Sequence, residues 1–189
     1  MWWGNRTAAL GRAFRLGLAL ALAGLTAACF QPLYADRPTG EEGGLRSALN
    51  GIEIDQIDAP KGSPQARVAV QLRNDLLFAL NGGAAASPYP THRLNIRMTT
   101  STSAIIVDIA TGRTVDEITG IDVVYRLTEI ATKRVVVNGT SFARATSTIP
   151  GQQQRFALAR ARIDAQERAA KEIVDQIRTR LASYFVAGT

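Results

Sequence analysis

The chain has 189 residues, a single cysteine, and 22 Lys and Arg against 16 Asp and Glu, which gives a formal net charge of +6. One cysteine excludes an intramolecular disulfide. Three of the basic residues lie within the first 28 residues, which hold no acid, so the remaining 161 residues carry a net charge of only +3. That length suits one domain with a real core, and so small a positive excess gives no indication of a nucleic-acid partner.

The N-terminal residues have the layout of a secretory signal peptide. Arg6, Arg12 and Arg15 form a basic lead, and an apolar run follows at residues 16–25. A transmembrane helix is the alternative, but it needs about 20 apolar residues, and this run reaches that length only if its flanks are included. We therefore interpret residues 1–28 as a signal peptide.

The apolar run ends at Cys29. Residues 26–29 read TAAC, which resembles the lipobox of bacterial lipoproteins, with Thr26 where leucine is more usual. In that motif the cysteine is acylated and becomes the new N-terminus, so Cys29 is the predicted lipid attachment site and membrane anchor. A buried cysteine in an ordinary leader is the alternative. Phe30 follows, and the absence of an Asp at this position favours the outer membrane.

Residues 29–50 are predicted to be the lipidated N-terminus and a flexible tether, because Pro, Gly and charged residues dominate residues 38–44. A single domain is predicted over residues 51–189. Its first element is a short strand at residues 51–57, where apolar and polar residues alternate.

A helix is predicted next. Ser63 and Pro64 are typical N-cap and first-turn residues, and a glycine pair after Asn81 ends the pattern. Between these signals an apolar residue recurs every four positions, which indicates one buried face. The residues of that face are Val68, Leu72, Leu76 and Leu80.

Three alternating runs then predict three long strands. The first begins at Leu94 and changes phase before Ile105, so a bulge or bend is expected at residues 100–104. The second covers residues 121–128 and the third residues 135–144. Turns are expected between the strands, at residues 111–113 and 131–133.

Residues 152–185 have the pattern of a long amphipathic helix with one charged face. Its apolar face is predicted to consist of Phe156, Ile163, Ala170, Ile173, Ile177, Leu181 and Phe185. The order strand, helix, three strands, helix predicts an α+β fold, a four-stranded, largely antiparallel sheet with two helices packed on one face. The other face of the sheet is then uncovered, which suits a partner as well as it suits solvent.

The sequence offers little for catalysis, which needs reactive groups that converge. His92 is the only histidine, and we interpret it as an isolated surface residue. No metal site is predicted without further His or Cys. Hydrolysis by a pair of carboxylates would use two of the four acids that flank one turn. We interpret these acids more simply as solvated residues at strand ends. Those acids are Asp108, Asp116, Glu117 and Asp122. We expect neither enzymatic activity nor a cofactor.

Basic side chains are the remaining candidates for binding, because guanidinium groups hold phosphates through two hydrogen bonds. Several lie on the predicted strands or their turns. Arg155, Arg160 and Arg162 crowd the start of the last helix, where the macrodipole disfavours cations. An anionic partner would offset this cost, although exposed arginines screened by salt lose little.

Two segments resemble the alphaproteobacterial form of the LPS-assembly lipoprotein family LptE. Residues 29–34 read CFQPLY and resemble the start of the mature family, although a glycine usually follows the cysteine there. Residues 156–170 and 177–185 resemble its C-terminal part. The order of elements agrees over most of the chain after residue 28.

The resemblance implies an outer-membrane protein that faces the periplasm and has two partners, lipopolysaccharide and the LptD β-barrel. In that family the lipoprotein sits as a plug inside the barrel, aids its assembly and contacts LPS. Basic side chains of the sheet and its turns are thereby implied as LPS contacts. The candidates are Arg93, Arg97, Arg113, Arg126, Lys133 and Arg134.

Two other functions fit the same residues. One is a generic periplasm-facing lipoprotein that binds another envelope component through the same anchor and sheet. The other is an envelope hydrolase that uses Asp108, Asp116 or Asp122. Co-purification of a barrel in stoichiometric amount separates the first of these from the LptE-like function, and substrate turnover would reveal the second.

Overall fold

The computed structural model describes residues 44–83, 87–108, 113–148 and 155–188, which contain three helices and four strands. In chain order the elements are α2 (Leu45–Asn50), β1 (Ile52–Ile54), α3 (Pro64–Asn81), β2 (His92–Asp108), β3 (Arg113–Glu129), β4 (Val135–Thr148) and α4 (Arg155–Ala187). All of them belong to one compact unit of the chain.

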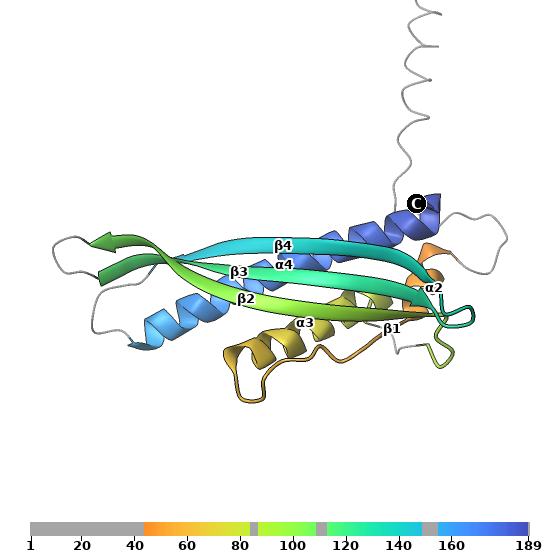
Figure 1. The fold of residues 1–189 in the computed structure, drawn as a ribbon, viewed down its shortest axis with the longest axis horizontal. Helices are drawn as coiled ribbons and strands as arrows, with labels where there is room; N and C mark the ends of the chain where they lie inside the picture. The colour runs from red at the N-terminus through yellow and green to blue at the C-terminus, as the bar shows by residue number, and fades with distance from the viewer. Residues whose placement is uncertain (1–43, 84–86, 109–112, 149–154, 189) are drawn as a thin grey trace, which may run out of the picture. The chain divides into compact units, whose positions relative to one another are not determined.

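The strands form one sheet in the order β1-β2-β3-β4 (Figure 1). The three long strands pair antiparallel, while the short β1 pairs in parallel with the start of β2. A parallel pair needs a crossover connection, and α3 lies within the one between β1 and β2. Both α3 and α4 pack on the same face of the sheet (Figure 1), which confirms the predicted α+β fold.

The ends of α3 follow the sequence signals. Ser63 Oγ accepts a hydrogen bond from the backbone N–H of Ala66 at 3.1 Å, and Pro64 takes the first turn, where its missing N–H is not needed. Gly82 ends the helix with a φ of 61°, a conformation that glycine adopts without strain. The predicted apolar face is buried and consists of Val68, Leu72, Leu76 and Leu80.

Two side chains of α4 bond to the backbone of β4, which is an edge strand of the sheet. Arg168 Nη2 donates to the carbonyl oxygen of Thr146 at 2.7 Å, and Gln176 Nε2 donates to that of Phe142 at 3.3 Å. Carbonyls on the outer side of an edge strand have no neighbouring strand to bond with. α4 therefore satisfies part of this edge in addition to covering the face of the sheet.

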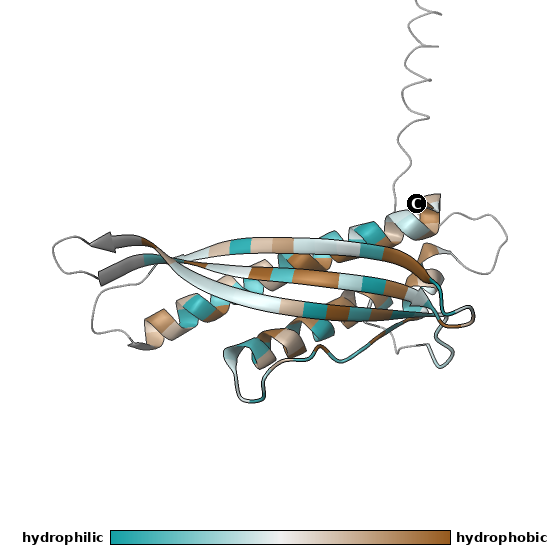
Figure 2. Ribbon diagram, viewed as in Figure 1, coloured by the Kyte–Doolittle hydropathy of each residue, from teal (hydrophilic) through white to brown (hydrophobic). Residues whose placement is uncertain are grey.

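The core changes along the length of the sheet. The turn half, nearest the β3–β4 turn, comprises residues 92–98, 121–129 and 135–143, and its inward side chains are mostly large and apolar. The far half comprises residues 99–104, 116–120 and 144–148. Figure 2 shows brown bands on the strands of the turn half and paler strands beyond them. The buried residues of the far half include Glu117, Thr119, Ala145 and Ser147.

The two halves also differ in their cover. Gln65, in the first turn of α3, donates a hydrogen bond from its Nε2 to the carbonyl of Met98 at 3.0 Å. From this point α3 runs toward the turn end of the sheet (Figure 1). The turn half is therefore covered by α3 and α4 together, and α4 is the described helix that covers the far half.

Three details differ from the sequence-based predictions. Residues 45–50, assigned there to the tether, form α2, because Leu49 is buried in the core and Leu45 packs against it. The irregularity in β2 lies at residues 104–107 instead of 100–104. Phe156, predicted on the apolar face of the last helix, is 89% exposed. The predicted turn at residues 111–113 and the start of the last helix at residues 152–154 fall largely outside the described residues.

Candidate functional site

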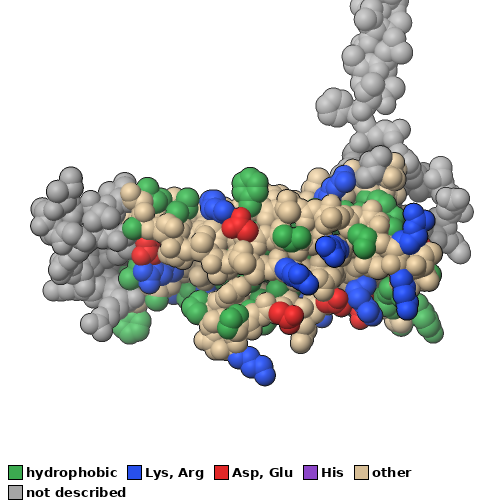
Figure 3. Space-filling view, in the orientation of Figure 1, with side chains coloured by type: hydrophobic (Ala, Val, Ile, Leu, Met, Phe, Trp, Pro, Cys, Tyr) green, Lys and Arg blue, Asp and Glu red, His purple; other side chains and the backbone are tan. Residues whose placement is uncertain are grey.

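The candidate site lies on the uncovered face of the sheet. Alternation along a strand sends every second side chain to each face. On β2, Arg93 and Arg97 are exposed, while Leu94 and Ile96, which lie between them, are buried. Figure 3 views this face and shows Lys and Arg side chains gathered toward the turn end of the sheet.

Strand pairing brings the arginines of β2 and β3 together. Asn95 lies opposite Arg126, so Arg97 is the diagonal neighbour of Arg126 on the same face. The turn that follows β3 adds two further cations, Lys133 and Arg134. The backbone of Lys133 takes the left-handed conformation there, with a φ of 55°. We call these residues the basic cluster, which consists of Arg93, Arg97, Arg126, Lys133 and Arg134.

Only one member of the basic cluster has an acidic partner among the described residues. Arg93 forms ion pairs with Glu53 at 3.0 Å and Asp55 at 3.6 Å, and the hydrogen bonds that it donates to the Glu53 carboxylate raise the pKa of Arg93. The other four side chains form no ion pair or hydrogen bond within the part of the chain that the structure describes. Four exposed cations in one region attract an anion, with a strength that depends on salt.

Arg113, the sixth predicted contact, does not belong to this cluster. It is the first residue of β3, thirteen positions before Arg126 on the same strand, and its backbone pairs with Asp108. At about 3.3 Å per residue, those positions are separated by roughly 40 Å. The sequence prediction therefore combined residues from the two turns at opposite ends of one long strand.

A second charged group on the open face was not among the predicted site residues. Arg144 Nη2 lies 2.9 Å from Asp122 Oδ1 and 3.1 Å from Oδ2, and its guanidinium is 5.9 Å from the centroid of the exposed Phe142 ring. Gly120, which pairs with Arg144, leaves room for it, since a Cβ there would be 2.9 Å from Arg144 Nε. A glycine inside an alternating strand was the available signal for such a close approach.

Two of the four acids considered for hydrolysis, Glu117 and Asp122, form ion pairs. Arg162 Nε and Nη2 donate to Glu117 Oε2 and Oε1 at 2.7 and 2.6 Å. This hydrogen bonding holds the pKa of Glu117 below its usual value. Arg162 thus has a partner within the fold, so its place near the start of α4 needs no anionic ligand, and Asp122 is likewise held by Arg144.

His92 is not the isolated surface residue that the sequence suggested. Its ring meets that of Phe185 edge-on with 5.1 Å between centroids, and Tyr184 lies at 6.5 Å. Burial lowers the pKa of His92, against the opposing effect of the nearby Glu129. The ring therefore joins the start of β2 to the last turns of α4, a packing role.

Within the described ranges, no helix is long and apolar enough to cross a membrane, and no three His, Cys, Asp or Glu side chains are placed to hold a metal ion. Cys29 and its lipobox lie outside the described residues. The lipid attachment site therefore remains a prediction from sequence.

No protein-family model and no curated protein matches this chain. Among solved structures, the fold is similar to that of a candidate lipoprotein from Caulobacter crescentus, with a TM-score of 0.58 and 21% identity over 76% of this chain and 96% of that one. A weaker likeness is to rare lipoprotein B from Shewanella oneidensis, with a TM-score of 0.47 and 13% identity over 71% of this chain and 96% of that one. Another is to a minor lipoprotein from Acinetobacter baumannii, with a TM-score of 0.48 and 9% identity over 71% of this chain and 91% of that one. The first likeness establishes a shared fold.

Proposed function

We propose that this chain is an outer-membrane lipoprotein, anchored through Cys29 and facing the periplasm, that acts as the accessory and plug subunit of an LPS translocon. It supports assembly of an LptD-type barrel and insertion of LPS into the outer leaflet. It catalyses no covalent step in this process.

The basic cluster carries the proposal. Arg97 and Arg126 lie on a sheet face that no described helix covers, Lys133 and Arg134 lie in the turn at the end of that sheet, and none of the four forms an ion pair among the described residues. Guanidinium and ammonium groups in such a setting suit phosphate groups, because charge-assisted hydrogen bonds to phosphate are the stronger ones. The phosphorylated head of LPS has this chemistry.

Two observations of other kinds support the same function. The motif at residues 26–34 resembles both a lipobox and the start of the mature LptE family. The fold is similar to that of the Caulobacter crescentus candidate lipoprotein, as the LptE resemblance leads one to expect of an envelope lipoprotein.

The deciding experiment is an affinity pulldown of the tagged full-length protein from detergent-solubilised outer membranes, with mass spectrometry of the complex and of the mature N-terminus. We expect a barrel protein in near-equimolar amount and a triacylated Cys29. An acylated protein that brings down no barrel would leave a generic periplasm-facing lipoprotein, and would overturn the translocon function.

The role of the basic cluster is tested by LPS binding to the purified protein. The double variant Arg97→Ala, Arg126→Ala removes two exposed cations that form no hydrogen bond or ion pair among the described residues, so stability should stay within about 0.5 kcal/mol. Affinity for LPS should fall by about tenfold or more, since hydrogen bonds to charged groups contribute about 1.5–3 kcal/mol each. The matched control is Lys61→Ala, an exposed cation just before α3, which should bind as the unaltered protein does.

A further inference from the structure

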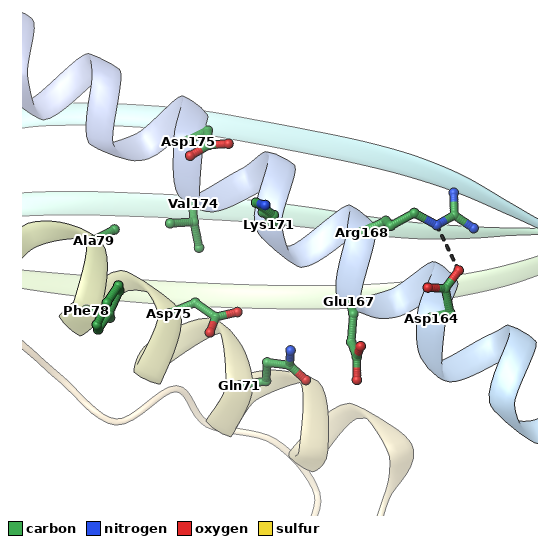
Figure 4. Close-up of a pocket in the computed structure, with 10 residues that line it drawn as sticks. All are labelled: Gln71, Asp75, Phe78, Ala79, Asp164, Glu167, Arg168, Lys171, Val174 and Asp175. Atoms are coloured by element: carbon green, nitrogen blue, oxygen red, sulfur yellow. Dashed lines mark hydrogen bonds and ion pairs between the residues drawn. The ribbon is translucent and has the colours of Figure 1, made fainter. Parts of the chain in front are cut away.

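A groove lies between α3 and α4, on the helical side of the molecule (Figure 4). Its volume is about 420 Å³. Its walls run from Gln71 to Ala79 on α3 and from Asp164 to Asp175 on α4. At 1.5 Å per residue, these segments are about 12 and 16 Å long. The groove is thus elongated, which suits a stretch of polypeptide better than a compact small molecule.

The apolar part of the groove contains an exposed aromatic ring. Phe78 is 69% exposed, although a ring of this size is usually buried. A Cβ on Gly83 would lie 3.2 Å from Phe78 Cε2, so the ring rests against the end of its own helix. Ala79 and Val174 complete the apolar surface. An exposed ring beside small apolar groups is a suitable site for an apolar side chain.

The polar part of the groove is acidic. Asp164 and Arg168 neutralise each other at 2.9 Å. Three carboxylates, those of Asp75, Glu167 and Asp175, then face a single cation, Lys171, which gives a net charge of −2. In Figure 4, Asp75 on α3 and Glu167 on α4 both point into the space between the two helices. A ligand that fits this charge is basic.

We propose that the groove between α3 and α4 binds an extended segment of the barrel-forming partner that carries one apolar side chain flanked by Lys or Arg. The apolar side chain packs against Phe78 and Val174, and the flanking cations pair with Asp75 and Glu167. At about 3.3 Å per residue, four or five residues span the groove. The identity of the partner rests on the proposed function, whereas the chemistry of the segment rests on the groove alone.

The groove and the basic cluster divide the molecule between two kinds of partner. The basic cluster lies on the uncovered face of the sheet, and the groove lies between the helices that cover the opposite face. Their charges are opposite, so a phosphorylated lipid is repelled from the groove and a basic segment is repelled from the cluster. The two partners therefore do not compete for one surface.

Site-specific photo-crosslinking in cells tests the contact. A photoreactive amino acid replaces Gln71, which lies in the groove, and in a matched strain it replaces Asn138, which is exposed on the open face. We expect a crosslink from position 71 to the barrel protein, mapped by mass spectrometry to a segment with an apolar residue between basic ones. A crosslink that maps to an acidic or uncharged segment would overturn the proposal.

Variants test the chemistry of the groove in the full-length protein. Phe78→Ala, and separately the charge reversal Asp75→Lys with Glu167→Lys, should each lower the amount of co-purified barrel by about tenfold. The matched controls are Phe156→Ala, also an exposed helical Phe, and Asp58→Lys, an exposed acid outside the groove. Both controls should retain the barrel, and thermal unfolding should show that all variants are folded.

The outcomes separate this inference from the proposed function. If the barrel co-purifies but the groove variants retain it fully and position 71 gives no crosslink to it, the groove proposal is wrong and the translocon function stands. If no barrel co-purifies with the unaltered protein, both are wrong. If the groove variants lose the barrel and both controls keep it, the groove is the docking site.

Discussion

The two halves of the sheet are built from the same three strands but are held together in different ways. In the turn half, residues such as Leu94, Ile121 and Leu127 are completely buried beneath two helices. In the far half, Thr119 and Ser147 are buried beneath α4, and neither hydroxyl has a hydrogen-bond partner among the described residues. Burial of apolar area stabilises the turn half, whereas the far half depends on a few polar contacts.

The difference shows that long strands do not by themselves make a uniform domain. The far half is tied to α4 by the Arg162–Glu117 pair and by the bond from Arg168 to the backbone of β4. Each such contact contributes only about 1–2 kcal/mol net. We therefore expect the far half to open locally at a lower free energy than the turn half.

The largest effect is expected from Leu127→Ala in the turn half. Leu127 has no exposed surface, so truncation removes buried area and leaves a cavity, which should cost about 2–5 kcal/mol. Chemical denaturation of the purified protein measures this loss. The matched control is Val124→Ala on the same strand, where the side chain is 48% exposed and the change should stay within about 0.5 kcal/mol. Equal losses for the two variants would contradict the assignment of the faces.

A smaller effect that depends on pH is expected from Glu117→Gln in the far half. Because the folded-state pKa of Glu117 is lowered, its pairing with Arg162 stabilises the fold fully above the unfolded-state value near 4.5. That contribution is lost as the pH falls through the lower folded-state pKa. At neutral pH the variant should be less stable by about 1–2 kcal/mol, and the difference should vanish in acid.

Urea denaturation across pH 2–7 measures this difference, with Asp58→Asn as the matched control because Asp58 is exposed and lies outside the far half. If the difference in free energy of unfolding between Glu117→Gln and the unaltered protein does not become smaller toward low pH, the ionised carboxylate has no role in this stability.

The smallest effect, and one of opposite sign, is expected from Thr119→Val. The Thr119 hydroxyl is buried and has no partner among the described residues, so a methyl group in its place removes a desolvation penalty. We expect the free energy of unfolding to rise by about 1 kcal/mol. Thermal unfolding measures it, and Thr140→Val, at an exposed position of β4, is the control. A loss of stability would indicate that an ordered water bonds to this hydroxyl.

Sequence reasoning worked where apolar residues recur with a clear period. The four-residue repeat of α3, its capping residues and the alternation of β3 and β4 each predicted an observed element. It was wrong about α2, because a six-residue helix with one buried side chain, Leu49, has too little periodicity to separate it from a tether. The position of the irregularity in β2 depends on strand pairing, which a single strand does not reveal.

The candidate site was predictable in type but not in extent. Arg93, Arg97 and Arg126 could be placed on strands from alternation alone. Which of them lie near Lys133 and Arg134 depends on strand pairing, whereas the separation of Arg113 from them follows from the length of β3. The groove between α3 and α4 joins positions almost a hundred residues apart, such as Asp75 and Glu167, and no local pattern relates them.

The two bonds from α4 to β4 also fix how the helix lies along the strand. Arg168 and Gln176 are eight residues apart, about 12 Å on a helix, and their acceptors Thr146 and Phe142 are four residues apart, about 13 Å on a strand. Because the two spacings agree, both bonds form at the same axial position of the helix relative to the strand. The two bonds together set the axial position of α4, and with it the alignment of the α4 side chains that face α3.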